Sequence, residues 1–258
     1  MAARCRLFAF AISLSTILGF LTVQAAPTGI PILVYHRFDP DNAPAMTVRT
    51  STFTGQLDWL AAHHYQIIPL DQALNIIAGK APPLATPAVV ITMDDGNESV
   101  FTQAWPVIQA RHIPITLFIY PSPISRASYA LTWDQISKML SSGLVEVQSH
   151  TYWHPNFNHE REHRTPADYQ AFVDMQLTKS KSVLEQKLNV PISVIAWPYG
   201  IVNPDLEAAA QRAGYQYGLA FTGGPAQPGA DPFAIPRIPV PDYARGRGFA
   251  HLLEDNLP

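Results

Sequence analysis

Short apolar runs alternate with amphipathic stretches along most of the chain. Six runs rich in Val, Ile and aromatic residues are typical of buried strands: Pro31–Tyr35, Ala88–Met93, Ile115–Tyr120, Leu144–Gln148, Ile192–Trp197 and Tyr217–Phe221. A seventh run, Ile235–Val240, is a weaker strand candidate because prolines interrupt it. Three segments between the runs carry apolar residues at helical spacing, and Thr52 and Thr132 are candidate N-caps of the first two: Phe53–His64, Trp133–Leu140 and Pro166–Leu188.

Repeated strand and helix alternation predicts an α/β protein with a mainly parallel sheet and helices outside it. About seven such units favour a distorted (β/α) barrel over an open doubly wound sheet. Polar residues follow several strands directly: His36 follows the first, Asp94 the second and His150 the fourth. Because the carboxyl ends of barrel strands share one rim, we expect these side chains to converge there.

The first residues have the pattern of an export signal. Arg4 and Arg6 precede an apolar stretch over residues 7–23, and Val23-Gln24-Ala25 ends in the small-residue pattern of a signal-peptidase site. The sequence therefore predicts a signal peptide over residues 1–25, a single domain over residues 26–258, and a periplasmic or secreted protein. A retained membrane anchor is the alternative. Cys5 is the only cysteine, so cleavage would leave a chain with no disulfide.

The balance of charged residues does not indicate a nucleic-acid partner. The chain carries 17 basic and 20 acidic residues, and Arg245-Gly246-Arg247 is its one basic cluster.

Two polar clusters at strand ends point to metal-assisted hydrolysis. Asp94 and Asp95 follow one apolar run, and His150 and His154 follow another about fifty-five residues later. Adjacent carboxylates at the end of a buried strand need water, a metal or a substrate, because unpaired carboxylates are costly to bury. One carboxylate and two neutral imidazoles form a common ligand set for a divalent metal, which leaves the second acid to handle protons.

These motifs resemble those of the NodB-homology polysaccharide deacetylases, carbohydrate esterase family four. Thr92-Met93-Asp94-Asp95-Gly96 is similar to their first motif, His150-Thr151-Tyr152-Trp153-His154 to their second, and Ala196-Trp197-Pro198-Tyr199-Gly200 to their third. The opening Pro31-Ile32-Leu33-Val34-Tyr35-His36-Arg37-Phe38 resembles the branch that acts on exported poly-N-acetylglucosamine. The resemblance implies a NodB-like barrel and removal of N-acetyl groups from an exported or cell-envelope polysaccharide.

The resemblance also implies the ligands and the base. Asp95, His150 and His154 would bind one divalent metal, expected to be Zn²⁺, with the two histidines on one face if a helical turn begins at the first of them. Asp94 would be the general base.

The third motif would supply the oxyanion and substrate contacts. The backbone N–H of Tyr199 would stabilise the oxyanion, and the side chains of Trp197 and Tyr199 are candidates to stack on sugar rings in the groove, with Pro198 between them.

The chain lacks clear matches to two side chains of the family pattern, the arginine that holds the base and the general acid. Ala196 stands where the family often has an arginine that holds the base, and Arg237 is a candidate to replace that arginine from a late strand. No late motif supplies a clear general acid. His36 is the candidate, because the first strand neighbours the last in a closed barrel; His251 is the alternative, and a purely structural role for His36 stays open.

Two other functions remain open at this stage. A carbohydrate-binding relative without turnover would fit the loss of the motif arginine at Ala196. A zinc metalloprotease would fit His159-Glu160-Arg161-Glu162-His163, which matches the His-Glu-x-x-His pattern, but this charged stretch lacks the apolar face that a buried catalytic helix needs.

Overall fold

One parallel sheet organises the computed structural model, which describes residues 29–254. Its strands lie in the order β10-β9-β8-β7-β6-β5-β1-β11, and β4 pairs with the start of β5. The strands are β1 Ile32–Tyr35, β4 Gln66–Ile67, β5 Ala88–Asp94, β6 Ile115–Ile119, β7 Val145–Ser149, β8 Val194–Ala196, β9 Tyr217–Ala220, β10 Ile235–Pro236 and β11 Ile238–Pro239. A separate parallel pair is formed by β2 Arg37–Asp39 and β3 Thr47–Arg49.

The weak strand predicted over Ile235–Val240 nearly closes this sheet into a barrel. Its first half, β10, pairs with β9, and its second half, β11, pairs with β1. Arg237 lies between the halves. Prolines cannot donate ladder hydrogen bonds, which agrees with the shortness of both pieces. The first strand therefore neighbours the last, as expected, and the predicted distorted (β/α) barrel is confirmed.

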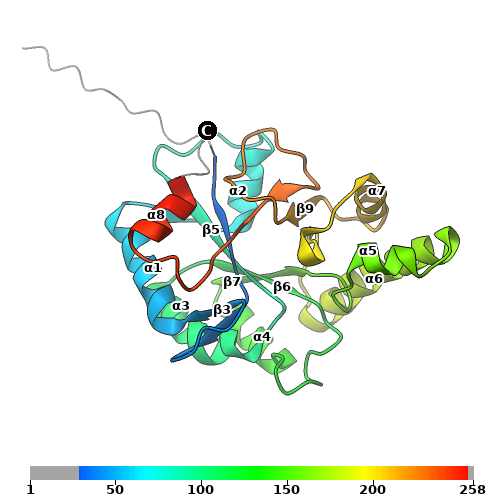
Figure 1. The fold of residues 1–258 in the computed structure, drawn as a ribbon, viewed down its shortest axis with the longest axis horizontal. Helices are drawn as coiled ribbons and strands as arrows, with labels where there is room; N and C mark the ends of the chain where they lie inside the picture. Colours follow the sequence, from blue (N-terminus) through cyan, green and yellow to red (C-terminus); the bar gives the residue numbers. More distant parts are fainter. Residues whose placement is uncertain (1–28, 255–258) are drawn as a thin grey trace, which may run out of the picture.

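Helices surround the outside of the sheet, with α1 and α3 on one side and α6 and α7 on the other (Figure 1). Their bounds are α1 Thr50–Ala62, α2 Leu70–Ile77, α3 Trp105–Arg111, α4 Trp133–Leu140, α5 Phe157–Glu162, α6 Pro166–Leu188, α7 Pro204–Arg212 and α8 Arg247–Glu254. A π-helical turn, Val100–Ala104, precedes α3. The predicted N-cap at Thr132 is confirmed by a capping box with Gln135. The N-cap predicted at Thr52 is wrong, because α1 already begins at Thr50 and Thr52 is buried within it.

The sheet separates two hydrophobic clusters. Leu33 and Tyr35 of β1 belong to the larger cluster under the surrounding helices, whereas Ile32 belongs to a second cluster. That second cluster joins interior-facing strand residues, Val90 and Leu219 among them, to the apolar face of α2. Alternate residues of a strand face opposite sides, so the second cluster fills the barrel interior. His36, Asp94 and His150 lie beyond this cluster, at the carboxyl ends of their strands.

No helix within residues 29–254 has the length and apolar character needed to cross a membrane. The predicted signal peptide, residues 1–25, and Cys5 lie outside the described residues.

Candidate active site

Three strand ends bring the predicted functional residues to one rim. Asp94 is the last residue of β5, His150 directly follows β7, and His36 directly follows β1. The register of β1 and β5 pairs Tyr35 with Met93, so His36 and Asp94 come one residue after this pair on neighbouring strands. The parallel sheet thus gathers side chains that are more than a hundred residues apart in the sequence.

Asp95, His150 and His154 form a compact cluster of candidate metal ligands. Their ligand atoms all lie within 4.8 Å of one another. The Nε2 atoms of His150 and His154 each lie 3.7 Å from Oδ1 of Asp95. The helical turn expected over the histidines is absent. Instead Thr151 and His154 adopt left-handed backbone conformations, with φ of 64° and 65°, and these fold the loop so that both rings meet the carboxylate.

The state of these three side chains fits a divalent cation. Asp95 Oδ1 is buried and finds no hydrogen-bond donor among residues 29–254. Nδ1 of His150 lies 2.8 Å from the carbonyl oxygen of Ala196 and must donate to it, so the Nε2 lone pair faces the cluster. Burial lowers the pKa of His150 to about 3 and also lowers the pKa of His154, which keeps both rings neutral. Two neutral imidazoles, a carboxylate and an open side are typical of a catalytic zinc centre.

Asp94 is held by an arginine that is distant in sequence. Nη1 of Arg237 donates to Oδ1 of Asp94, and Nη2 donates to Oδ2, both over 2.8 Å. Nη1 also donates to the Thr92 hydroxyl over 3.2 Å. Both charged side chains are fully buried, and the guanidinium lies between the rings of Phe118 and Phe221, 5.1 and 4.9 Å from their centroids.

This pairing keeps Asp94 ionised. Burial alone raises the pKa of a carboxyl group, but the Arg237 guanidinium outweighs it, aided by His150, and the pKa of Asp94 falls to about 2. Within residues 29–254 no arginine donates a hydrogen bond to the neighbouring Asp95, and burial raises its pKa. Asp94 is therefore ionised near neutral pH and held in one orientation, while Asp95 forms part of the cluster of candidate metal ligands.

His36 is buried beside these carboxylates. Burial lowers its pKa, while Asp94 and Asp95 act in the opposite direction. Its ring lies 6.0 Å from that of Phe221. The alternative acid, His251, is exposed on α8.

The side chains of the third motif, residues 196–200, differ in exposure: some are buried in the core and one is at the surface. Tyr199 has a left-handed backbone with φ of 57°, is 58% exposed, and its ring lies 4.7 Å from that of His154. Trp197 is fully buried and donates from Nε1 to the carbonyl of Phe233 over 2.8 Å, so its predicted place in a sugar-binding groove is wrong. Pro198 is buried as well, and its side chain does not reach the groove either. Trp197 follows β8 immediately and still points into the core, where its indole N–H finds an acceptor.

The sequence reasoning missed Tyr120, whose ring lies 5.4 Å from that of His154. Burial raises the pKa of Tyr120, and a hydrogen bond with Tyr129 adds to the effect. Tyr120 directly follows β6, so the strand-end rule that selected His36, Asp94 and His150 would have selected it too.

The protease-like motif does not assemble a comparable centre. His159 and Glu160 lie on the short helix α5, where Glu160 pairs with Arg164 over 2.5 Å. The rings of His159 and His163 stack 4.2 Å apart. In the part of the chain that the structure describes, the one group of three or more candidate ligands is Asp95, His150 and His154.

Comparison with known proteins agrees with this geometry. The family model described as polysaccharide deacetylase matches residues 81–218. A poly-beta-1,6-N-acetyl-D-glucosamine N-deacetylase from Staphylococcus aureus (strain MRSA252) is 27% identical over 213 residues, which cover 81% of this chain and 71% of that protein. The putative polysaccharide deacetylase YxkH from Bacillus subtilis (strain 168) is 27% identical over 229 residues, covering 88% and 77% of the two chains.

Solved structures share the fold over most of their length. IcaB from Ammonifex degensii superposes with a TM-score of 0.75 at 25% identity, covering 85% of this chain and 94% of that chain. The Streptococcus pyogenes deacetylase PplD, in complex with acetate, has a TM-score of 0.77 at 22% identity, covering 89% and 100%, and shows likeness of fold. The family inferred from the three motifs is thus confirmed: this chain belongs to the polysaccharide deacetylase family.

Proposed function

We propose that this protein is a metal-dependent hydrolase that removes N-acetyl groups from N-acetylglucosamine-type units of an exported or cell-envelope polysaccharide. The observation that carries the proposal is the cluster of Asp95, His150 and His154 beside an ionised Asp94 that Arg237 holds in place. The relatives named for poly-N-acetylglucosamine deacetylation support this choice of substrate. A divalent ion bound by the cluster, expected to be zinc, would supply the Lewis acidity that activates water and polarises an amide carbonyl.

The residues around the cluster would move the protons. Asp94 accepts a proton from the water that attacks the acetamide carbon, because its charged form is fixed by Arg237. The backbone N–H of Tyr199 donates to the carbonyl oxygen as that atom gains negative charge. The protonated form of His36, which the neighbouring carboxylates of Asp94 and Asp95 favour against the effect of burial, donates a proton to the nitrogen as the C–N bond breaks, which releases acetate and a free amine.

The same pairing argues for turnover over sugar binding alone. Ala196 was the reason to consider a relative without activity, because the family arginine is missing there. Arg237, between β10 and β11, restores a guanidinium on both oxygens of Asp94. The export signal in residues 1–25 and a deacetylase domain over residues 26–258 complete the proposal of a periplasmic or secreted enzyme.

The test is acetate release from N-acetylglucosamine oligomers, with and without a chelator, followed by restoration with Zn²⁺. Asp94→Asn should keep its metal and lose on the order of a hundredfold or more in kcat, since an amide cannot accept the proton from water. Near-normal turnover by Asp94→Asn, or full activity after chelation and verified loss of metal, would refute the proposal.

The role of His36 is tested separately. An amine must be protonated to leave, whereas the phenolate of an activated aryl acetate need not be. His36→Ala should therefore lose activity on acetylated oligomers much more than on an aryl acetate, and His251→Ala should change neither rate. Equal loss on both substrates would assign His36 a structural or metal-related role.

A further inference from the structure

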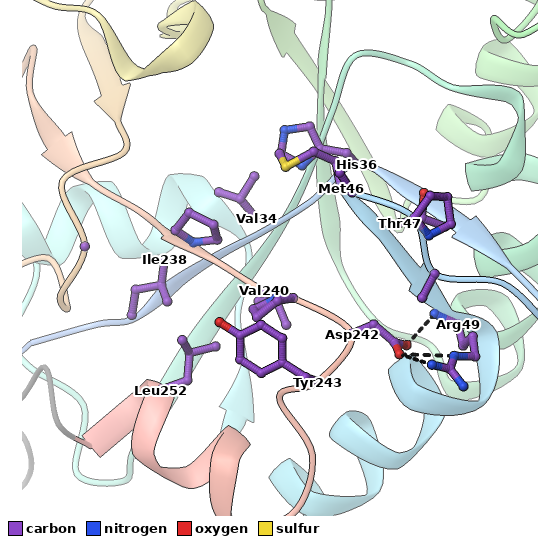
Figure 2. A pocket seen from close by; sticks show the side chains of 16 residues that line it. Val34, His36, Met46, Thr47, Arg49, Ile238, Val240, Asp242, Tyr243 and Leu252 are labelled. Atoms are coloured by element: carbon purple, nitrogen blue, oxygen red, sulfur yellow. Dashed lines mark hydrogen bonds and ion pairs between the residues drawn. The ribbon is translucent and has the colours of Figure 1, made fainter.

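A cavity adjoins the proposed active site. It has a volume of about 590 Å³, and His36 forms part of its wall. The other walls come from the 43–46 loop, from the end of β11 and the loop after it, and from α8. Figure 2 shows His36 and Met46 at one end and Tyr243 with Leu252 at another. A volume of this size is typical of small-molecule binding sites.

The cavity begins where the reaction would take place. Val34, which also lines it, pairs with Thr92 in the register of β1 and β5, and both belong to the strand face that carries His36 and Asp94. A polysaccharide whose acetylated unit lies beside His36 and Asp94 has further units attached to it, and these must lie against the neighbouring surface.

The walls of the cavity suit a sugar ring. One side is apolar and includes Val240, Leu252 and the ring of Tyr243, whereas Arg49 and Asp242 lie on another side (Figure 2). A pyranose has flat faces of C–H groups, which pack on aromatic and aliphatic side chains, and hydroxyl groups at its edge, which need polar partners.

Tyr243 is exposed although the loop that carries it is firmly held. Asp242 accepts hydrogen bonds from the Arg49 backbone N–H over 2.9 Å and from Nη2 of Arg245 over 2.7 Å, and it pairs with Nη2 of Arg49 over 2.7 Å. On the other side, Nε2 of the buried Gln56 donates to the carbonyl of Ala244 over 2.7 Å. Tyr243 between these anchors is 85% exposed. A rigid loop that presents an aromatic ring to solvent loses little entropy when a ligand packs on it.

We propose that this cavity is a second sugar-binding subsite, which receives the N-acetylglucosamine-type unit next to the one being deacetylated and uses the ring of Tyr243 as a platform. The inference rests on the proposed function and extends it, because it makes the enzyme prefer chains over single sugars.

The experiment compares kcat/KM on N-acetylglucosamine oligomers of increasing length for the wild type, Tyr243→Ala and Tyr243→Phe. Tyr243→Ala should lower the preference for the longest oligomer over the monosaccharide by roughly 2- to 12-fold, through KM, which is the range expected for loss of one aromatic contact. Tyr243→Phe keeps the ring and should keep the preference. Met175→Ala removes an exposed apolar side chain of α6 and should have no effect. Thermal unfolding of Tyr243→Ala should match the wild type, because the side chain is mostly in water.

Each outcome bears on one proposal. A wild type that releases acetate while Tyr243→Ala retains its full length preference overturns the subsite and leaves the proposed function intact. Equal loss in Tyr243→Ala and Tyr243→Phe overturns the platform, because the hydroxyl would then be the binding group. A wild type that releases no acetate overturns the proposed function. In that case calorimetry measures the affinity of the wild type and of Tyr243→Ala for the longest oligomer. Weaker binding by Tyr243→Ala supports the subsite, and unchanged binding overturns it.

Discussion

Replacing Arg237 by methionine tests whether a fully buried ion pair supports both the fold and the base. The substitution keeps a long, flexible apolar side chain between the rings of Phe118 and Phe221 but removes the guanidinium. Asp94 then loses two hydrogen bonds of 2.8 Å and the guanidinium charge that lowers its pKa. Because the Asp94 side chain is buried away from bulk solvent, bulk water does not replace these two contacts.

The expected loss of unfolding free energy comes from the Asp94 carboxylate, which is left buried without a partner. Removing one partner of a buried ion pair destabilises a protein by about 3–5 kcal/mol, since the remaining charge stays buried. For a chain of this size the melting temperature should fall by roughly 6–20 °C. Activity should fall too, because burial without Arg237 raises the pKa of Asp94 and favours the protonated form, which cannot act as a base. Arg237→Lys keeps the charge but loses the paired geometry, so its effects should be intermediate.

Thermal and urea unfolding of Arg237→Met, Asp94→Asn and the double variant measure the interaction directly. The double variant should lose less free energy of unfolding than the sum of the single variants, with a coupling of about 1–3 kcal/mol. Arg212→Met is the matched control. Arg212 pairs with Asp174 over 3.2 Å at the surface, where the two side chains are 54% and 45% exposed, so its loss should cost at most about 1 kcal/mol.

Two results would refute this reasoning. If Arg237→Met lowers the free energy of unfolding by less than about 1 kcal/mol, then removal of Arg237 does not leave an unpaired charge on Asp94. Strict additivity of the single variants would show that the two residues do not depend on each other, and the orientation of Asp94 would then need another source.

Three further predictions concern the metal cluster, the third motif and a surface ion cluster. Elemental analysis should find about one metal ion per chain in the wild type, much less in His154→Ala and an unchanged amount in His159→Ala; the reverse would favour the protease-like motif. Trp197→Ala should cost about 3–5 kcal/mol of unfolding free energy in urea, whereas Tyr199→Ala should raise KM with little change in stability, and comparable unfolding curves would contradict this assignment. Burial raises the pKa of Asp242, but hydrogen bonds to its carboxylate outweigh this and hold the pKa below the usual range, so its stabilisation is present above about pH 4 and is lost as the pH falls through the folded-state pKa. Asp242→Asn should therefore be less stable than the wild type by about 1 kcal/mol at pH 7, and the difference should shrink in acid; a gap that is constant with pH would exclude this origin.

Local patterns in the sequence determined most of the barrel. Runs such as Ala88–Ile91 are apolar throughout because strands of a parallel sheet are covered on both faces, and this signal needs no knowledge of distant residues. The missed strands are short. Strands β2, β3 and β4 have two or three residues each, which is too few to show a period. Helix α5 was not predicted, because its charged sequence has no apolar face, and it packs through a single buried residue, Phe157.

The candidate site was predictable where its residues follow strands directly. Asp94, Asp95, His150 and His154 lie in two short motifs, and parallel strands bring their carboxyl ends to one rim whatever the packing outside. The conformation of the loop from His150 to His154 was predicted incorrectly. Its spacing suggested a helical turn, but the left-handed conformations of Thr151 and His154 bring the rings together by another route.

The sequence by itself determined which chemical groups this protein offers at its strand ends: a pair of carboxylates, a pair of imidazoles and the order in which they occur. It offered Arg237 only as a candidate partner of Asp94, and the tertiary structure decided which contacts form. Closure of the barrel through β10 and β11 sends Arg237 to Asp94, and packing of Trp197 against the Phe233 carbonyl takes that ring out of the groove. Such contacts join residues that are 143 and 36 positions apart, and they depend on how strands and side chains pack in three dimensions, which the hydrophobic pattern of a single segment does not contain.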